Sequence, residues 1–134
     1  TALCRVVISD DEIGSPYPDF LDILCCMTKD AYDKYVTEMR ANGTVVINSS
    51  LFEKTEFPEN LQVYGVDTAK ITAETGNARG ANLVILGAMI KATEMLDKEQ
   101  FENTLEEYFE KQGKNNPSNL ECFRLGYEQA VRME

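Results

Sequence analysis

Three strongly polar residues stand at the start of an otherwise apolar stretch, and they are the residues of this chain best suited to hold a charged ligand. Asn77, Arg79 and Asn82 lead into residues 83–90, which have almost no polar face. The first turn of a helix carries free backbone N–H groups, and a guanidinium binds phosphate or carboxylate through paired hydrogen bonds. We expect this helix mouth either to bind an anionic ligand or a partner's carboxylate, or to act as a polar cap that ties the helix to a neighbouring loop.

A second polar group follows a β-branched run. Asn48, Ser49 and Ser50 end that run, and the pairs Met27-Thr28 and Asp67-Thr68 place polar side chains at the ends of two other apolar runs. In open α/β sheets, ligands collect at the carboxyl ends of the strands. Each of these groups could equally cap a helix or form a turn. Their convergence on one edge of the predicted sheet favours a binding surface.

The groups needed for independent catalysis are missing. A hydrolase or transferase needs a nucleophile with a base beside it, and the chain has no histidine. Ser49 and Ser50 lack the Gly-x-Ser-x-Gly context of a nucleophile elbow. The acidic pairs at residues 10–11 and 106–107 are interpreted as solvent-exposed charges, the first on a turn and the second on a helix face. The sequence also contains no glycine-rich loop of the kind that binds phosphate. We therefore expect no catalysis by this chain alone, and no catalytic residue in it.

Composition and charge narrow the classes of partner. The 134 residues, 43% of them hydrophobic, fit a single domain spanning residues 1–134. A domain of this size buries roughly two-thirds of its unfolded surface and so supports its own core. With 13 basic and 23 acidic residues, the formal net charge is −10, which disfavours nucleic acid and anionic membrane surfaces and favours a basic protein partner. No apolar run approaches the length of a membrane span.

Four cysteines, Cys4, Cys25, Cys26 and Cys122, are too scattered to form a metal site. Cys25 and Cys26 are adjacent and should face opposite sides of a strand, no Cys-x-x-Cys spacing occurs, and histidine is absent. An iron–sulfur or zinc centre within this chain is therefore not expected. We interpret the four as reduced, buried thiols of a cytoplasmic protein.

The order of predicted elements indicates a three-layer α/β/α fold with a mostly parallel sheet. Strands are predicted at residues 4–9, 20–27, 44–47 and 61–66, with a hairpin after the first. A first helix is predicted to begin at Thr28, to run through Met39 and to end at Asn42 and Gly43. Further helices are predicted at 67–75, at 78–96, and after the capping residues Asp97 and Asn116. The helix at 78–96 should be among the most buried elements, because its sequence leaves almost no polar face.

Five segments together carry a resemblance to a known family. They are Ser-Asp-Asp-Glu-Ile-Gly-Ser-Pro at 9–16, Val-Ile-Asn-Ser-Ser-Leu at 46–51, Asn-x-Arg-x-x-Asn at 77–82, Leu-Gly-Ala at 86–88 and Gly-Tyr-Glu at 126–128. In order and spacing this set resembles the gamma subunit of 2-oxoacid:ferredoxin (or other acceptor) oxidoreductases of the pyruvate, 2-oxoglutarate and ketoisovalerate types. The resemblance covers essentially the whole chain.

The resemblance implies a Rossmann-like domain. Members of the family begin with a Gly-Gly-Gln-Gly loop in a βα unit, which is absent here, so the resemblance also implies that about 30–50 N-terminal residues are missing.

The resemblance further implies a function inside a larger enzyme. The family converts a 2-oxoacid and coenzyme A into an acyl-CoA and carbon dioxide, and passes electrons to ferredoxin or another acceptor. Thiamine diphosphate and iron–sulfur clusters do this chemistry and are held mainly by the alpha and beta subunits and, where present, a delta subunit. The gamma subunit organises the site, and 2-oxoglutarate is our first choice of substrate over pyruvate, a branched-chain oxoacid or indolepyruvate.

Six residues are then expected to face a partner or cofactor: Asn48, Ser49, Ser50, Asn77, Arg79 and Asn82. Two other functions stay open, a free-standing Rossmann-like nucleotide-binding module and a purely structural interaction subunit. Retention of a nucleotide by the isolated chain would favour the first of these. The second would be favoured if no small molecule altered an assembled enzyme through this subunit.

Overall fold

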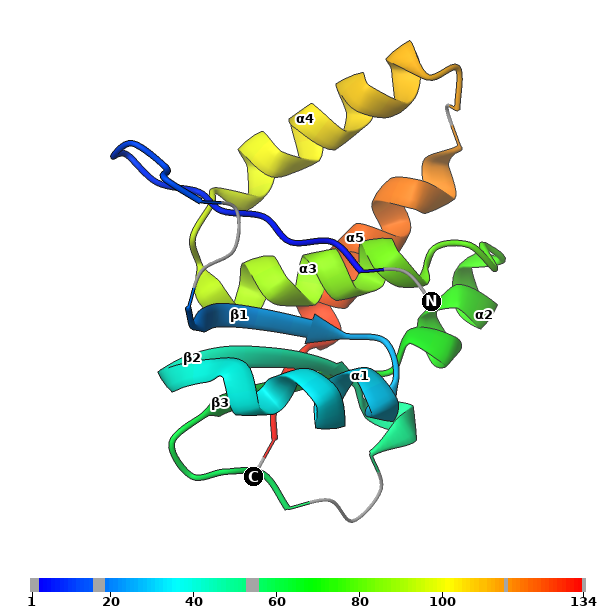
Figure 1. Cartoon of the computed structure of the whole chain (residues 1–134). Helices are drawn as coiled ribbons and strands as arrows, with labels where there is room; N and C mark the ends of the chain where they lie inside the picture. The colour runs from blue at the N-terminus through cyan, green and yellow to red at the C-terminus, as the bar shows by residue number, and fades with distance from the viewer. Residues whose placement is uncertain (1–2, 16–18, 53–55, 115, 134) are drawn as a thin grey trace.

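A four-stranded sheet forms the centre of the molecule (Figure 1). The structure, a computed structural model, describes residues 3–15, 19–52, 56–114 and 116–133. Strands β1 (Leu21–Cys26), β2 (Met39–Asn48) and β3 (Gln62–Val66) run parallel, and the short β4 (Val131–Arg132) pairs antiparallel with β3. The strands lie in the order β1-β2-β3-β4. The predicted mostly parallel sheet is confirmed.

Helices cover both faces of this sheet, as a three-layer fold requires. Figure 1 shows α1 on one face and α3 with α5 on the other, with α4 standing further out. The helices and the two short 3₁₀ turns have these bounds: α1 Lys29–Tyr35, η1 Val36–Glu38, η2 Ser49–Leu51, α2 Thr68–Thr75, α3 Ala81–Thr93, α4 Lys98–Lys111 and α5 Pro117–Gln129. None of the helices in the described part of the chain is long and apolar enough to cross a membrane.

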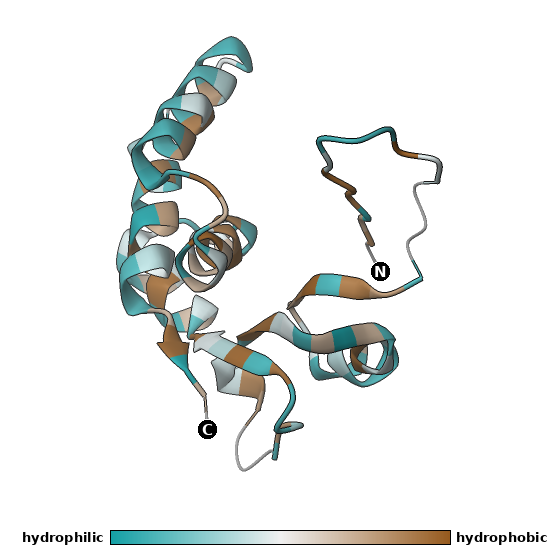
Figure 2. Ribbon diagram, turned by 90° about the vertical axis from the view of Figure 1, so that its left-hand side faces the viewer, coloured by the Kyte–Doolittle hydropathy of each residue, from teal (hydrophilic) through white to brown (hydrophobic). Residues whose placement is uncertain are grey.

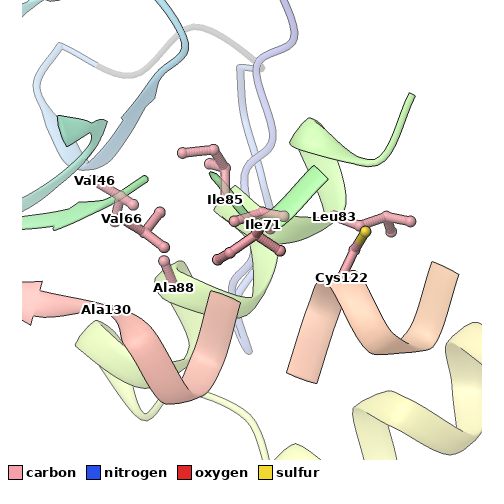
Figure 3. Packing of buried hydrophobic residues seen from close by; sticks show 9 residues of the cluster. Val46, Val66, Ile71, Leu83, Ile85, Ala88, Cys122 and Ala130 are labelled. Atoms are coloured by element: carbon pink, nitrogen blue, oxygen red, sulfur yellow. The ribbon is translucent and has the colours of Figure 1, made fainter. Parts of the chain in front are cut away.

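The core is divided by the sheet into two clusters. Successive side chains of a strand point to opposite faces, so Val45 and Ile47 pack with Tyr32 of α1 on one side. On the other side, Val46 packs with Val66 and with Ala88 of α3 (Figure 3). The buried β2 thus holds the two layers of helices together.

Helix α3 is the most deeply packed helix of the second cluster. Six of its 13 residues are buried, which confirms the prediction for this segment. Two glycines let α3 and α5 approach closely: a Cβ at Gly87 would overlap the backbone oxygen of Phe123, and a Cβ at Gly126 would overlap that of Val84. Gly126 is the first residue of the Gly-Tyr-Glu motif, and this contact explains why a glycine stands there.

Four helix starts are formed as predicted. The side chains of Thr28, Asp67, Asp97 and Asn116 each accept a hydrogen bond from a backbone N–H in the first turn of α1, α2, α4 and α5. These bonds satisfy donors that the helix itself leaves unpaired. By contrast α3 begins at Ala81, after Gly80, without a side-chain cap. Its observed bounds are therefore narrower than the predicted 78–96.

Two predictions about secondary structure are wrong. Residues 4–9 form no strand, and no hairpin follows them within the described residues, because no neighbouring strand pairs with this segment. The helix predicted to reach Met39 ends at Tyr35, and residues 39–43 belong to β2. There Met39 pairs with Leu21 and a bulge containing Asn42 at φ 65° follows. Pairing with β1 overrides the helical spacing of the side chains. Pro16, the last residue of the motif at 9–16, lies outside the described residues.

Candidate functional site

The end of β2 forms a compact hydrogen-bonded corner. The side-chain oxygen Oδ1 of buried Asn48 accepts from the hydroxyl of Ser50 at 2.9 Å and from the backbone N–H of Thr68 at 3.3 Å. Ser49 lies over the neighbouring strand, since a Cβ at Gly65 would come within 3.0 Å of its Cβ. Asn48 therefore joins the end of β2 to the start of α2, and Ser50 is the exposed member of this corner.

The segment before α3 forms a second corner, and its central residue faces inward. Asn77 is buried; its Nδ2 donates to Oδ1 of Asn119 in α5 at 2.8 Å, and its own Oδ1 accepts from the backbone N–H of Arg79 at 3.2 Å. These bonds attach the α2–α3 connection to α5. The partner Asn119 was not predicted, because nothing in the spacing of α5 marks this residue as facing a loop.

Arg79 and Asn82 are exposed at the start of α3. Oδ1 of Asn82 accepts from the backbone N–H of Leu83 at 2.9 Å. The guanidinium of Arg79 makes no hydrogen bond or ion pair with a residue that the structure describes. Because a positive charge at a helix N-terminus opposes the helix dipole, Arg79 does not stabilise α3 through that dipole, and its guanidinium is unpaired among the described residues.

The six predicted residues thus fall into two groups rather than one. Asn48 contacts Thr68 at the first residue of α2, whereas Asn77 follows the last turn of the same helix. The eight residues of α2 span about 12 Å at 1.5 Å per residue. Figure 1 shows α2 at the end of the sheet toward which β1 points. Both groups therefore lie on the predicted side of the sheet, but no hydrogen bond between them joins the described side chains.

One hollow in the described surface lies away from both corners. It has a volume of about 380 Å³ and is lined by Phe57, Pro58, Glu59, Leu61, Val63, Arg132 and Met133. Leu61 and Val63 stand at the start of β3, so this hollow is at the opposite end of the strand from the polar corner. None of the six predicted residues lines it.

The cationic groups near α4 are already paired. The ring of Tyr127, in the Gly-Tyr-Glu motif, has the ammonium of Lys91 5.0 Å and that of Lys98 5.1 Å from its centroid. Lys98 and Arg124 both pair with Glu102, at 3.2 Å and 3.3 Å. These contacts hold α4 against α3 and α5, which gives the tyrosine of this motif a structural role.

The cysteines divide into two classes. Cys26 and Cys122 are buried, whereas Cys4 and Cys25 are exposed, so the interpretation of all four as buried is wrong for two. The opposite facing of Cys25 and Cys26 is as predicted, because they alternate along β1. Burial, with a smaller effect of the neighbouring Cys25, raises the pKa of Cys26 to about 12. In the described residues, no three His, Cys, Asp or Glu side chains are gathered as metal ligands.

Comparisons with known proteins agree with one another. A sequence model of the family "Pyruvate ferredoxin/flavodoxin oxidoreductase" matches residues 1–129. The chain is 33% identical to the 2-oxoglutarate synthase subunit KorC of Methanocaldococcus jannaschii over 131 residues, 96% of this chain and 69% of KorC. It is 31% identical to the ketoisovalerate oxidoreductase subunit VorA of Methanothermobacter marburgensis over 127 residues, 94% of this chain but 26% of VorA.

A solved structure shares the fold. The gamma subunit of a keto/oxoacid ferredoxin oxidoreductase from Geobacter sulfurreducens PCA is 28% identical, with a TM-score of 0.69 over 81% of this chain and 63% of that chain. The chain thus spans about two-thirds of the length of KorC and about a quarter of VorA.

Proposed function

Since this chain belongs to the pyruvate ferredoxin/flavodoxin oxidoreductase family, we propose that it works as a gamma-type subunit of a 2-oxoacid oxidoreductase. The family match over residues 1–129 carries this proposal. The sequence adds that no histidine is available as a catalytic base. The activity therefore belongs to an assembly in which this chain is one part.

In the proposed reaction, a 2-oxoacid and coenzyme A give an acyl-CoA and carbon dioxide. The bond to the carboxylate breaks and carbon dioxide leaves, the acyl group bonds to the sulfur of coenzyme A as the thiol releases its proton, and the two electrons pass to ferredoxin or another acceptor. Thiamine diphosphate and iron–sulfur clusters supply this chemistry from the alpha, beta and, where present, delta subunits. This chain organises the site between them, in the cytoplasm.

The substrate that we propose is 2-oxoglutarate. The likeness to KorC, a 2-oxoglutarate synthase subunit, supports it at 33% identity. The likeness to VorA, a ketoisovalerate oxidoreductase subunit, is nearly as strong at 31%. Pyruvate, ketoisovalerate and indolepyruvate are therefore the competitors that an assay must include.

We propose that Arg79 binds coenzyme A or a carboxylate of a partner subunit. Its guanidinium has no described partner and is exposed at the start of α3, and a phosphate is a good ligand for such a group. Asn82, Ser49 and Ser50 would border the same surface. Asn48 and Asn77 would support it from beneath, because both are buried and hydrogen-bonded.

A purely structural role is the second candidate. It is favoured by the inward hydrogen bonds of Asn48 and Asn77, which use much of their bonding capacity inside the chain. If the role is purely structural, Arg79 forms an ion pair with a protein carboxylate and does not contact coenzyme A. Replacement of Arg79 would then change subunit affinity alone.

The test is anaerobic isolation of the native protein with its partners. Co-purifying subunits are identified by mass spectrometry, and reduction of a viologen acceptor is measured with coenzyme A and each of the four oxoacids. We expect sister subunits of the same oxidoreductase, with the highest kcat/KM for 2-oxoglutarate. A higher kcat/KM for another oxoacid would replace the substrate, and activity with none of the four would refute the proposed function.

A further inference from the structure

The connection between α2 and α3 is held by α5 at two points, one on each side of Arg79. Helix α5 lies in the same layer as α2 and α3, on the face of the sheet opposite α1 (Figure 2). Before Arg79, Nδ2 of Asn77 donates to Oδ1 of Asn119 at 2.8 Å. After Arg79, Gly80 lies against Cys122, and a Cβ at Gly80 would come 2.5 Å from the Sγ atom. Asn119 and Cys122 are three residues apart, so one face of α5 supports the whole connection.

Asn77 fixes the connection through four hydrogen-bonding groups. Its backbone N–H donates to the carbonyl oxygen of Thr72 at 3.2 Å, and its own carbonyl oxygen accepts from the N–H of Gly80 at 3.0 Å. In its side chain, Nδ2 donates to Asn119, and Oδ1 accepts from the backbone N–H of Arg79 at 3.2 Å. A buried polar network in which each of these groups is bonded is rigid. The backbone at Arg79 is therefore held in one conformation.

The support for Asn77 is itself well anchored. Asn119 stands in the first turn of α5, which begins with Pro117. The side chain of Asn116 accepts from the backbone N–H of Ser118 at 3.1 Å and from its hydroxyl at 2.8 Å. A capped first turn with proline at its first position does not fray easily. Oδ1 of Asn119 thus offers Asn77 an acceptor at a fixed place.

The side chain of Arg79 contrasts with this fixed backbone. It is exposed, and its guanidinium is unpaired among the described residues. An arginine on a mobile loop loses the freedom of that loop when it binds a ligand, whereas an arginine on a fixed backbone does not. Paired hydrogen bonds from a guanidinium to a phosphate or a carboxylate also need a set direction. The connection therefore presents Arg79 in a form suited to binding an anion.

We propose that Asn119 is a positioning residue, which sets through Asn77 the direction in which Arg79 meets its anionic ligand. This inference rests on the proposed function, from which it takes the binding of Arg79 to coenzyme A or to a carboxylate of a partner subunit. Asn119 itself does not contact the ligand. It keeps Oδ1 of Asn77 turned toward the N–H of Arg79, and without that acceptor the side-chain amide of Asn77 rotates and the turn that it closes opens.

The first experiment measures amide hydrogen exchange in the full-length subunit by NMR. In Asn119→Ala the amide of Arg79 should exchange about threefold to tenfold faster than in the wild type, because its bond to Asn77 is no longer supported. Asn119→Asp keeps an acceptor at the same place and should keep the slow exchange. Leu105→Ala is the control for a general loss of stability, since Leu105 packs against the same hydrophobic cluster from α4. It should leave the exchange of Arg79 unchanged.

The second experiment is a double-mutant cycle with Arg79→Ala and Asn119→Ala in the assembled enzyme. The KM for coenzyme A and the Kd of the full-length subunit for its sister subunits are measured for each variant. Asn119→Ala should raise the quantity that Arg79→Ala raises, by about threefold to tenfold, and should add nothing in the Arg79→Ala background. Asn119→Asp should stay close to the wild-type value. An asparagine with a purely structural role would lower Tm without this coupling.

The outcomes separate the possibilities. Unchanged exchange of the Arg79 amide in Asn119→Ala overturns the proposal, and so do effects on KM or Kd that simply add. A lower Tm of full-length Arg79→Ala with unchanged KM and Kd also overturns it, because the partner of Arg79 would then lie in its own chain. Normal oxoacid turnover without coupling refutes the positioning role alone. Coupled effects on Kd in a complex that oxidises no oxoacid would refute the proposed function and leave the positioning role intact.

Discussion

Replacement of Gly126 by alanine tests the contact on which the described fold depends most. A Cβ at this position would overlap the backbone oxygen, carbonyl carbon and Cα of Val84 in α3. Backbone atoms cannot rotate aside as a flexible side chain would, so α3 and α5 must move apart. The cluster around Val84, Ala88 and Cys122, all fully buried, would then lose its close packing.

The expected net effect is a clear loss of stability. Alanine in a helix interior gains about 1 kcal/mol over glycine, whereas overpacking a rigid core costs about 3 kcal/mol where backbone is the obstacle. The difference is about 2 kcal/mol. For a chain of 134 residues, with about 2.1 cal/mol/K of unfolding entropy per residue, this lowers Tm by roughly 7 °C.

The assay is thermal and urea unfolding of the purified protein, followed by circular dichroism. Gly14→Ala is the matched control, because a Cβ there meets no atom within 4 Å, and its free energy of unfolding should change by less than about 1 kcal/mol. An alanine at position 126 that leaves the free energy of unfolding unchanged would refute the close approach of α3 and α5.

Three further predictions concern the polar corners and the buried thiol. Arg79→Ala should raise the KM for coenzyme A or the Kd for sister subunits by about tenfold, as loss of one charged hydrogen bond does, at an unchanged Tm; a lowered Tm with normal kinetics would contradict this. Asn77→Ala leaves Asn119 without its partner and should cost about 1–3 kcal/mol in urea unfolding; an unchanged midpoint would exclude this role. Because the pKa of Cys26 is about 12 in the folded chain against an ordinary 9.0, the unfolded chain loses this proton first, and stability should fall as pH rises from about 9 toward 12. In Cys26→Ala the fall should be smaller, because the raised pKa values of Cys25 and Tyr32 still contribute to it, and a wild-type curve no steeper than that of the variant would contradict this.

Sequence predicts structure correctly where the local sequence alone determines it. Thr28, Asp67, Asp97 and Asn116 cap helices because a side-chain oxygen and the first-turn N–H groups are only two or three residues apart. The burial of α3 was also predictable. A helix with no polar face in residues 83–90 must be covered.

Local sequence does not predict the structure where a distant pairing partner determines it. The helical spacing from Tyr32 to Met39 is real, but Met39 pairs with Leu21 of β1, and pairing between strands is not visible in the spacing. Residues 4–9 have strand composition and lack a strand beside them.

The end of the sheet at which the six proposed residues lie was predictable from the sequence. Their division into two corners was not, because it depends on Asn48 bonding to Thr68 and Asn77 bonding to Asn119. Both bonds join residues 20 or more positions apart, and no local pattern marks such pairs.

The most direct test of the central claim is an add-back experiment with the assembled enzyme. The sister subunits are purified anaerobically without this chain, and oxoacid-dependent reduction of a viologen acceptor in the presence of coenzyme A is measured before and after the full-length subunit is added. The account predicts little activity from either part alone and restored turnover from the mixture. Full activity of the sister subunits without this chain would contradict it.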